Sequence, residues 1–237
     1  MAYGVNAPFG FRPLYSMVGG SWTIKYNPYP IFASADGATT YASNIFTGDA
    51  VYWRFNAAID AGSGTIGLEA DGGTALAIGV FQGCEYTDVN GNPIYSPYWP
   101  GGTRVMPGTK IIARIIDDPN VVYDIQVSTA NNTLADAVWN PGDMSYNAKF
   151  AVGGGGGNLV PNNPASGSLK TGLSAGYLDG STAAITATLQ LKVLGYTEHP
   201  QNYIYDSTGA VRPFLNVRVM FNAMNFKSTG TLGIAPA

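Results

Sequence analysis

Residues 110–127, KIIARIIDDPNVVYDIQV, place two runs of β-branched residues on either side of a turn at 117–120. Proline presets φ for a turn, and Asp and Asn side chains bond their own backbone, so the centre is expected to turn. In the second run, 121–127, apolar and polar residues alternate, which is the period of a strand with one buried face. The first run, 111–116, is apolar on both sides, as in a central strand. The stretch therefore predicts the core hairpin of an all-β protein.

Further strands are predicted along the rest of the chain. Alternating or β-branched patterns occur at 45–55, 76–86, 183–194 and 215–221. Asn90-Gly91 separates two extended segments, which is a strong hairpin signal. No segment has the pattern of a helix of three turns, so an antiparallel sandwich or barrel, jelly-roll-like, is the expected fold class.

The two ends of the pattern define the expected domain organisation. Residues 1–35 are rich in aromatics and prolines, and these prolines disfavour a helix or a central strand, so we expect an extended N-terminal arm. The arm lies either along its own domain, as a strap, or on a neighbouring subunit. Residues 36–237 are expected to form a single β-domain. Within it, 128–181 has weak alternation and five consecutive glycines at 153–157, which predicts a long loop-rich insertion.

The composition indicates a surface made for contact with other proteins. Charged residues make up 11% of the chain, against about 25% in ordinary soluble domains, and Gly, Tyr and Pro are abundant. Charge depletion is typical of interfaces, because burying a charge costs desolvation energy. The alternative is a stable β-protein with a polar, uncharged surface. We predict that the arm reaches outside its own subunit through Phe9, Phe11, Trp22, Tyr26 and Tyr29.

Charge and cysteine usage bound the remaining classes. The net charge is −3 and the basic residues are scattered, so direct nucleic-acid binding is not expected. The single cysteine, Cys84, excludes an intramolecular disulfide and is expected in the core. The first residues lack the charged and apolar regions of a signal peptide, and no apolar run approaches the ~20 residues of a membrane span. We therefore expect a role in the cytoplasm or in an assembly built there.

The sequence gives no positive sign of catalysis, of a cofactor or of a metal. The single histidine, His199, cannot build a two-histidine metal site. Asp117 and Asp118 are adjacent, so their side chains point apart, and turn capping explains them. The segment 88–92 begins like a calcium loop, but its glycine is misplaced and position twelve is Trp99. An Asn-Gly turn explains that segment instead.

Three stretches resemble a family of tailed-phage head proteins, identified as capsid decoration (cement) proteins. They are NAPFGFRP at 6–13, IDDPNVVYDIQ at 116–126, and TGLS at 171–174 followed by LDGSTAA at 178–184 and TLQLKVL at 188–194. The resemblance implies a β-rich, often trimeric protein without enzymatic activity. Its partners would be the major capsid protein and further copies of itself, on the outer capsid surface of a virion assembled in the host cytoplasm.

Two other classes of function stay open on the residues alone. A phage receptor- or carbohydrate-binding module on the tail would use aromatic stacking platforms, for which the candidates are Trp22, Trp53, Trp99 and Trp139. A glycan-active enzyme would need two carboxylates brought together from distant positions, and the sequence singles out no such pair.

Overall fold

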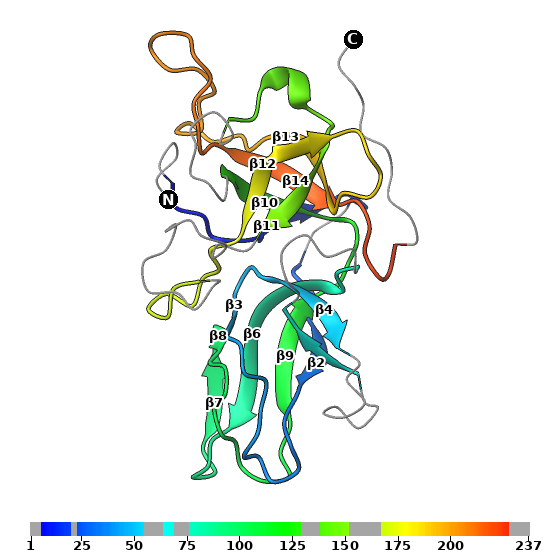
Figure 1. Ribbon diagram of the computed structural model, residues 1–237, viewed down its shortest axis with the longest axis vertical. Coiled ribbons are helices and arrows are strands. Elements are labelled where there is room, and N and C mark those ends of the chain that lie inside the picture. The colour runs from blue at the N-terminus through cyan, green and yellow to red at the C-terminus, as the bar shows by residue number, and fades with distance from the viewer. Residues whose placement is uncertain are drawn as a thin grey trace.

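The computed structural model describes residues 6–19, 23–54, 64–68, 76–128, 138–151 and 167–227. It is an all-β structure with one short 3-10 turn, η1 (Pro141–Asp143), and its strands form two barrels stacked along the long axis (Figure 1). This confirms the expected fold class. Most neighbouring strands are antiparallel, but β2 with β5 and β10 with β12 pair in parallel, so both sheets are mixed.

The upper barrel in Figure 1 is a sheet with the order β1-β10-β12-β11-β13-β14. A further pairing of β10 with β14 closes it, and β1 adds to β10 outside the ring. Its strands are β1 (Arg12–Ser16), β10 (Val121–Ser128), β11 (Asn147–Ala151), β12 (Tyr177–Ala184), β13 (Leu191–Tyr196) and β14 (Asn216–Phe221).

The lower barrel has the order β4-β5-β2-β9-β6-β7 and is closed by the pairing of β4 with β6. Here β7 is the strand outside the ring. The strands are β2 (Asn27–Ile31), β4 (Ala50–Arg54), β5 (Thr65–Gly67), β6 (Gly79–Thr87), β7 (Pro93–Ser96) and β9 (Ile111–Ile116). Two short strands, β3 (Ile45–Phe46) and β8 (Tyr98–Trp99), form a separate pair.

The predicted core hairpin is wrong in its pairing, although both of its strands exist. β9 pairs with β2 and β6 in the lower barrel, whereas β10 pairs with β1 and β14 in the upper barrel. Each strand therefore has both edges occupied and cannot pair with the other. The turn at 117–120 carries the chain from one barrel to the other.

The prediction that β10 buries one face is also wrong, because all of its residues are buried. The side chains of Asp124, Gln126 and Ser128 are buried with hydrogen-bond partners, as is usual for buried polar groups. Asp124 accepts a hydrogen bond from the Thr197 hydroxyl (2.6 Å) and one from the Asn216 side chain (3.1 Å), and it forms an ion pair with Arg12. The outward face of β10 is thus covered by a polar network that includes the N-terminal strand.

Residues 1–35 do not form a separate arm in the described part of the chain. β1 lies in the upper barrel and β2 in the lower one, so the boundary expected at residue 36 separates no domain. Proline has no backbone N–H, so it fits into a sheet only where it need not donate a hydrogen bond to a neighbouring strand. A register irregularity follows Pro13. Pro28 and Pro30 are two residues apart, so the amides they lack would point to the same edge of β2.

The expected insertion at 128–181 and the expected strand at 183–194 also need correction. The insertion contains β11, which lies between β12 and β13 in the sheet. Most of β12 also falls within the insertion. The run at 183–194 is divided by a turn between the end of β12 and the start of β13, where Ile185 is exposed. The glycines at 153–157 lie outside the described residues.

The expected core residues are all buried. All of them except Leu189 belong to two clusters, one mainly in the upper barrel and one in the lower. The alternating patterns predict the core residues Ile111, Ile115, Tyr123, Ile125, Leu189, Leu191, Val217 and Val219, and each is 9% exposed or less. The strands at 76–86 and 215–221 and the Asn-Gly hairpin between β6 and β7 are confirmed as well.

Candidate interaction surfaces

The waist surface comprises Tyr15, Met17, Val18 and Tyr26, exposed side chains near the connection between the barrels. Tyr15 lies opposite Val122 in the pairing of β1 with β10, and the Met17 amide donates to the carbonyl of Asn120 (2.9 Å). Tyr26 immediately precedes β2, whose first residue lies opposite the end of β9. Both sides of this surface therefore adjoin the turn at 117–120.

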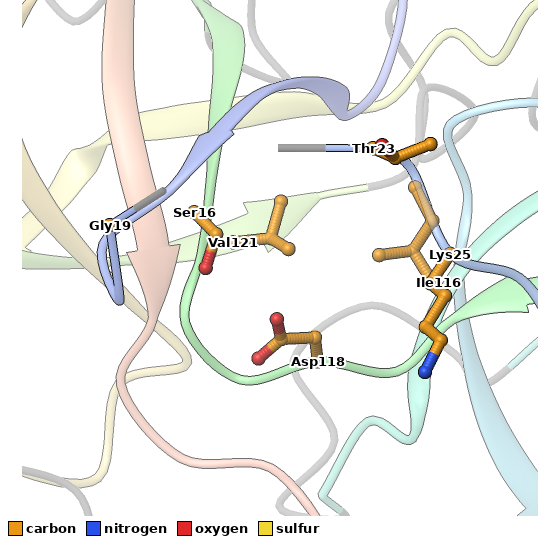
Figure 2. Close-up of a pocket in the computed structure, with 7 residues that line it drawn as sticks. All are labelled: Ser16, Gly19, Thr23, Lys25, Ile116, Asp118 and Val121. Atoms are coloured by element: carbon orange, nitrogen blue, oxygen red, sulfur yellow. The ribbon is translucent and has the colours of Figure 1, made fainter. Parts of the chain in front are cut away.

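A pocket of about 280 Å³ opens beside the waist surface (Figure 2). Figure 2 shows Ile116 and Val121 facing each other across it, with Asp118 and Lys25 along its lower side. The volume is just below the roughly 300–1,000 Å³ of typical small-molecule sites. Asp118 and Lys25 carry opposite charges, so the rim favours neither an anionic nor a cationic ligand. Residues 20–22, between the lining residues Gly19 and Thr23, lie outside the described part. The pocket lies between the end of β9 and the start of β10.

The finger, residues 198–214, projects from the far end of the upper barrel as the orange loop in Figure 1. Its turn is ordered by the Asp206 carboxylate, which accepts bonds from Thr208 and from the amide of Ala210. These bonds lower the pKa of Asp206, so its carboxylate stays ionised as a turn cap. Tyr203 and Tyr205 are 56% and 52% exposed on this ordered loop.

Tyr203 is also held from outside the turn. The Arg212 guanidinium lies 3.9 Å from the centroid of its ring, in cation–π geometry. The Arg212 amide donates to the carbonyl of Ile204 (2.8 Å), which joins the two sides of the finger. The finger thus presents a tyrosine ring, that of Tyr203, which is already held by a neighbouring side chain.

The tip surface comprises the exposed residues Val89, Tyr95 and Met106. They lie on or beside the hairpin of β6 and β7, which is at the opposite end of the molecule (Figure 1). Val89 lies in the turn of the β6–β7 hairpin, and the Met106 amide donates to the carbonyl of Thr87 (3.0 Å). Tyr95 is 70% exposed, on the strand outside the ring. The Asp88 carboxylate accepts bonds from Asn90 and Asn92, so it serves as a turn cap here.

The predicted interface residues are dispersed by the fold. Phe11 is 2% exposed in the upper core, so it cannot contact a neighbour in the folded chain, and its assignment to an interface is wrong. Phe9 is half-buried under the Arg12 guanidinium. Tyr29 is also half-buried, and its hydroxyl donates to Asp117 (2.7 Å).

Of the predicted interface residues, Tyr29 is held within its own chain and Tyr26 is open to solvent. Burial and the Asp117 hydrogen bond raise the pKa of Tyr29, so its hydroxyl stays protonated as a donor. Tyr26 is exposed, as an interface residue must be, and it belongs to the waist surface. Trp22 lies outside the described residues.

No periodic pattern in the sequence singles out the finger or tip residues. Each is an isolated apolar residue within or beside a turn, and such residues carry no periodicity. The available signals were the turns themselves, Asp206–Gly209 and Asn90-Gly91, which expose their neighbours.

Burial also decides most of the tryptophan candidates for carbohydrate stacking. Trp99 and Trp139 are 0% and 1% exposed, so neither offers a ring face to a sugar. Trp53 is half-buried and packs edge to face with Tyr29, with ring centroids 5.5 Å apart. Stacking platforms of the predicted kind are therefore not formed by Trp99 or Trp139.

The remaining chemical candidates are placed as ordinary structural residues. His199 is exposed in the finger, and Cys84 is buried beside the carbonyl of Tyr98, where burial raises the pKa of the thiol to about 12. Among the described residues, His, Cys, Asp and Glu side chains form no group of three or more that could hold a metal ion. None of the helical structure described is long and apolar enough to cross a membrane.

Comparisons of the chain with protein-family models, with curated proteins and with solved structures find no match.

Proposed function

We propose that this protein is a non-enzymatic structural protein of a phage virion, which decorates and stabilises the head by bridging major capsid protein subunits on its outer surface. The proposal combines the resemblance of the quoted stretches to cement proteins with the contact surfaces of the fold. It places the protein on the virion after assembly in the host cytoplasm, most simply as a homotrimer, without cofactor, nucleic acid or membrane.

The observation that carries the proposal is the position of exposed apolar side chains at opposite ends of an elongated molecule. The finger lies at one end of the long axis and the tip surface at the other (Figure 1). A molecule with adhesive ends can hold two neighbouring subunits together, whereas a ligand-binding module needs one concave site.

The chemistry of these ends suits attachment to protein. Tyrosine and arginine dominate the energetic centres of protein interfaces, and Tyr203 with Arg212 supplies both. An exposed Val or Met side chain that becomes buried gains about 1.5–3 kcal/mol, so a few such residues at each end suffice for binding. Fixed side chains lose little entropy on association, and the finger is already ordered.

Shells assembled from the major capsid protein of the same phage test the proposal in a sedimentation assay. A finger variant, Tyr203→Ser with Tyr205→Ser, and a tip variant, Val89→Ser with Tyr95→Ser, are each expected to bind at least ten-fold more weakly. Ile185→Ser is the control, because Ile185 is also exposed, at 48%, but lies outside both surfaces.

Cryo-electron microscopy of the intact particle separates the proposal from its alternative. Density for this protein on the icosahedral head, touching more than one subunit, supports bridging. Density on the tail would replace the proposal with the receptor-binding alternative. Undiminished shell binding by both surface variants would refute the assignment of the two ends.

A further inference from the structure

Three segments meet where the two barrels touch, and each approaches within hydrogen-bond distance of another. The segment 46–49 joins β3 to β4, while 9–11 and 172–176 lead into β1 and β12 of the upper barrel. Four backbone hydrogen bonds of 2.8 or 2.9 Å connect them, from the amide of Gly10 to the carbonyl of Gly176, from Phe11 to Gly48, from Thr47 to Gly172 and from Ser174 to Thr47.

This junction is too tight for any added side chain. Gly10 has a φ of +73°, and a Cβ there would lie 2.4 Å from the carbonyl oxygen of Gly48. Gly48 has a φ of +95°, and a Cβ there would lie 2.8 Å from the carbonyl oxygen of Phe9. Glycine is therefore required at both positions for space as well as for backbone conformation.

A carboxyl group is enclosed in the junction. Asp49 is fully buried, and one of its oxygens, Oδ2, accepts a hydrogen bond from the Phe46 amide (2.8 Å). The other oxygen, Oδ1, accepts from the Ser174 hydroxyl (2.5 Å), whose oxygen in turn accepts from the Gly176 amide (2.8 Å). The Asp49–Ser174 bond thus links the lower barrel to the strand entry of the upper one.

We infer that the junction is a proton-linked latch between the barrels: enclosing the Asp49 carboxyl group away from water favours its neutral form, so the junction is more firmly closed when Asp49 is protonated, although the bonds from Ser174 and Phe46 favour the ionised form. The inference does not depend on the proposed function, because it concerns contacts within one chain. Loosening would free the loop at 167–176 from the surface it covers. That surface includes Phe46, which stacks on Tyr98 beneath the loop.

The electrostatics of the site agree with this inference. Burial raises the pKa of Asp49 to about 7, and the hydrogen bonds from Ser174 and Phe46 oppose that rise. The segments packed around Asp49 carry the charged groups Arg12, Arg54, Glu85, Lys170 and Asp179, and the titratable groups Cys84, Tyr52 and Tyr177. None of these described residues is a cause of the shift. Arg12 is paired with Asp124 and Arg54 lies over the ring of Tyr41, so neither cation is directed at Asp49.

The sign of the pH effect follows from the raised pKa. Between about pH 4 and pH 7 the closed junction holds a proton that an open junction releases. Closure therefore weakens as pH rises through this window and becomes constant above it. With an open-state pKa near 3.8 and a closed-state pKa near 7, the closed-to-open ratio falls about 30-fold from pH 5.5 to pH 8.5.

Amide hydrogen exchange measures the latch directly at the amides of Thr47 and Ser174. After correction for intrinsic exchange rates, their protection in the wild type should fall about 30-fold between pH 5.5 and pH 8.5. In Asp49→Asn, which cannot ionise, protection should change less than about 3-fold. Asp88→Asn is the matched control on an exposed turn and should behave as the wild type.

Two outcomes would overturn the latch. The first is equal pH dependence of protection in the wild type and in Asp49→Asn. The second is a carbon-13 NMR titration of wild-type Asp49 with a midpoint below about 5, near the ordinary value for an aspartate. This titration decides the matter even if Asp49→Asn does not fold. Ser174→Ala should move the midpoint upward, since the Ser174 bond lowers the pKa.

Discussion

Replacing Phe11 with alanine should strongly destabilise the upper barrel. The Phe11 ring lies 4.5 Å from that of Phe150, 5.1 Å from Phe221 and 5.4 Å from Tyr123, measured between centroids. A Phe→Ala change in a core costs about 3–5 kcal/mol, and each aromatic contact contributes roughly a further 0.5–1.5 kcal/mol. The Phe11 amide donates a hydrogen bond to the carbonyl of Gly48, which restricts collapse of the structure around the cavity. We therefore expect the loss in unfolding free energy to lie in the upper part of the range of about 3–5 kcal/mol. Such a loss is a large fraction of a typical stability of about 5–15 kcal/mol.

Urea unfolding followed by tryptophan fluorescence provides the assay. Trp139 belongs to the same core cluster as Phe11, whereas Trp99 belongs to the lower cluster. Recording each curve with and without Trp139→Phe separates the upper-barrel signal. Phe9→Ala is the control, because Phe9 is half-buried, and it should cost about 1 kcal/mol or less. A loss of unfolding free energy below about 1 kcal/mol for Phe11→Ala, or one equal to that of Phe9→Ala, would refute the placement of Phe11 in the core. It would favour the extended N-terminal arm instead.

The remaining predictions concern the core, metals and assembly. Ile125→Asp should abolish soluble expression, because an unpaired carboxylate in the centre of β10 costs several kcal/mol; normal yield and an unchanged melting temperature would contradict this. A chelator should leave the melting temperature within about 2 °C in calorimetry, since turn capping accounts for Asp88. Light scattering at micromolar concentration should give a homotrimer, and Met17→Ser with Val18→Ser should reduce its mass if the waist surface lies at the subunit contact. A wild-type monomer that remains monomeric on shells would count against assembly.

The sequence predicted strands better than it predicted their partners. Patterns of β-branched residues placed β6, β9, β10 and β14 closely, because burial of a strand face is a local property of the pattern. Pairing is not local. The turn at 117–120 has the residues of a hairpin, yet β9 pairs with two other strands and β10 with three. A strand apolar on both faces indicates a central position, and two central strands in succession are as compatible with two sheets as with one hairpin.

The prediction that β10 buries only one face is wrong for a related reason. Alternation predicts solvent on the polar face, but Asp124 and Gln126 are buried there with specific partners. Gln126 accepts a hydrogen bond from the Ala7 amide (2.8 Å) and donates to the carbonyl of Phe214 (3.2 Å). These partners lie about 90 to 120 residues away in the chain, beyond any periodicity. The same contacts hold the N-terminal residues against the barrel, which is why the expected arm is absent from the described residues.

The interaction surfaces depend on closure of the barrels, which no single stretch encodes. Tyr95 and Tyr123 each follow a β-branched apolar residue and precede a polar one within a strand, yet Tyr95 is exposed and Tyr123 is buried. The difference is that β10 belongs to the closed ring, whereas β7 lies outside the ring of the lower barrel. The residues of β10 point into the core or toward a covering layer, while β7 leaves one face to solvent. The composition could therefore show that some aromatic surface exists, and only the strand pairing could show that it lies at the tip, the waist and the finger.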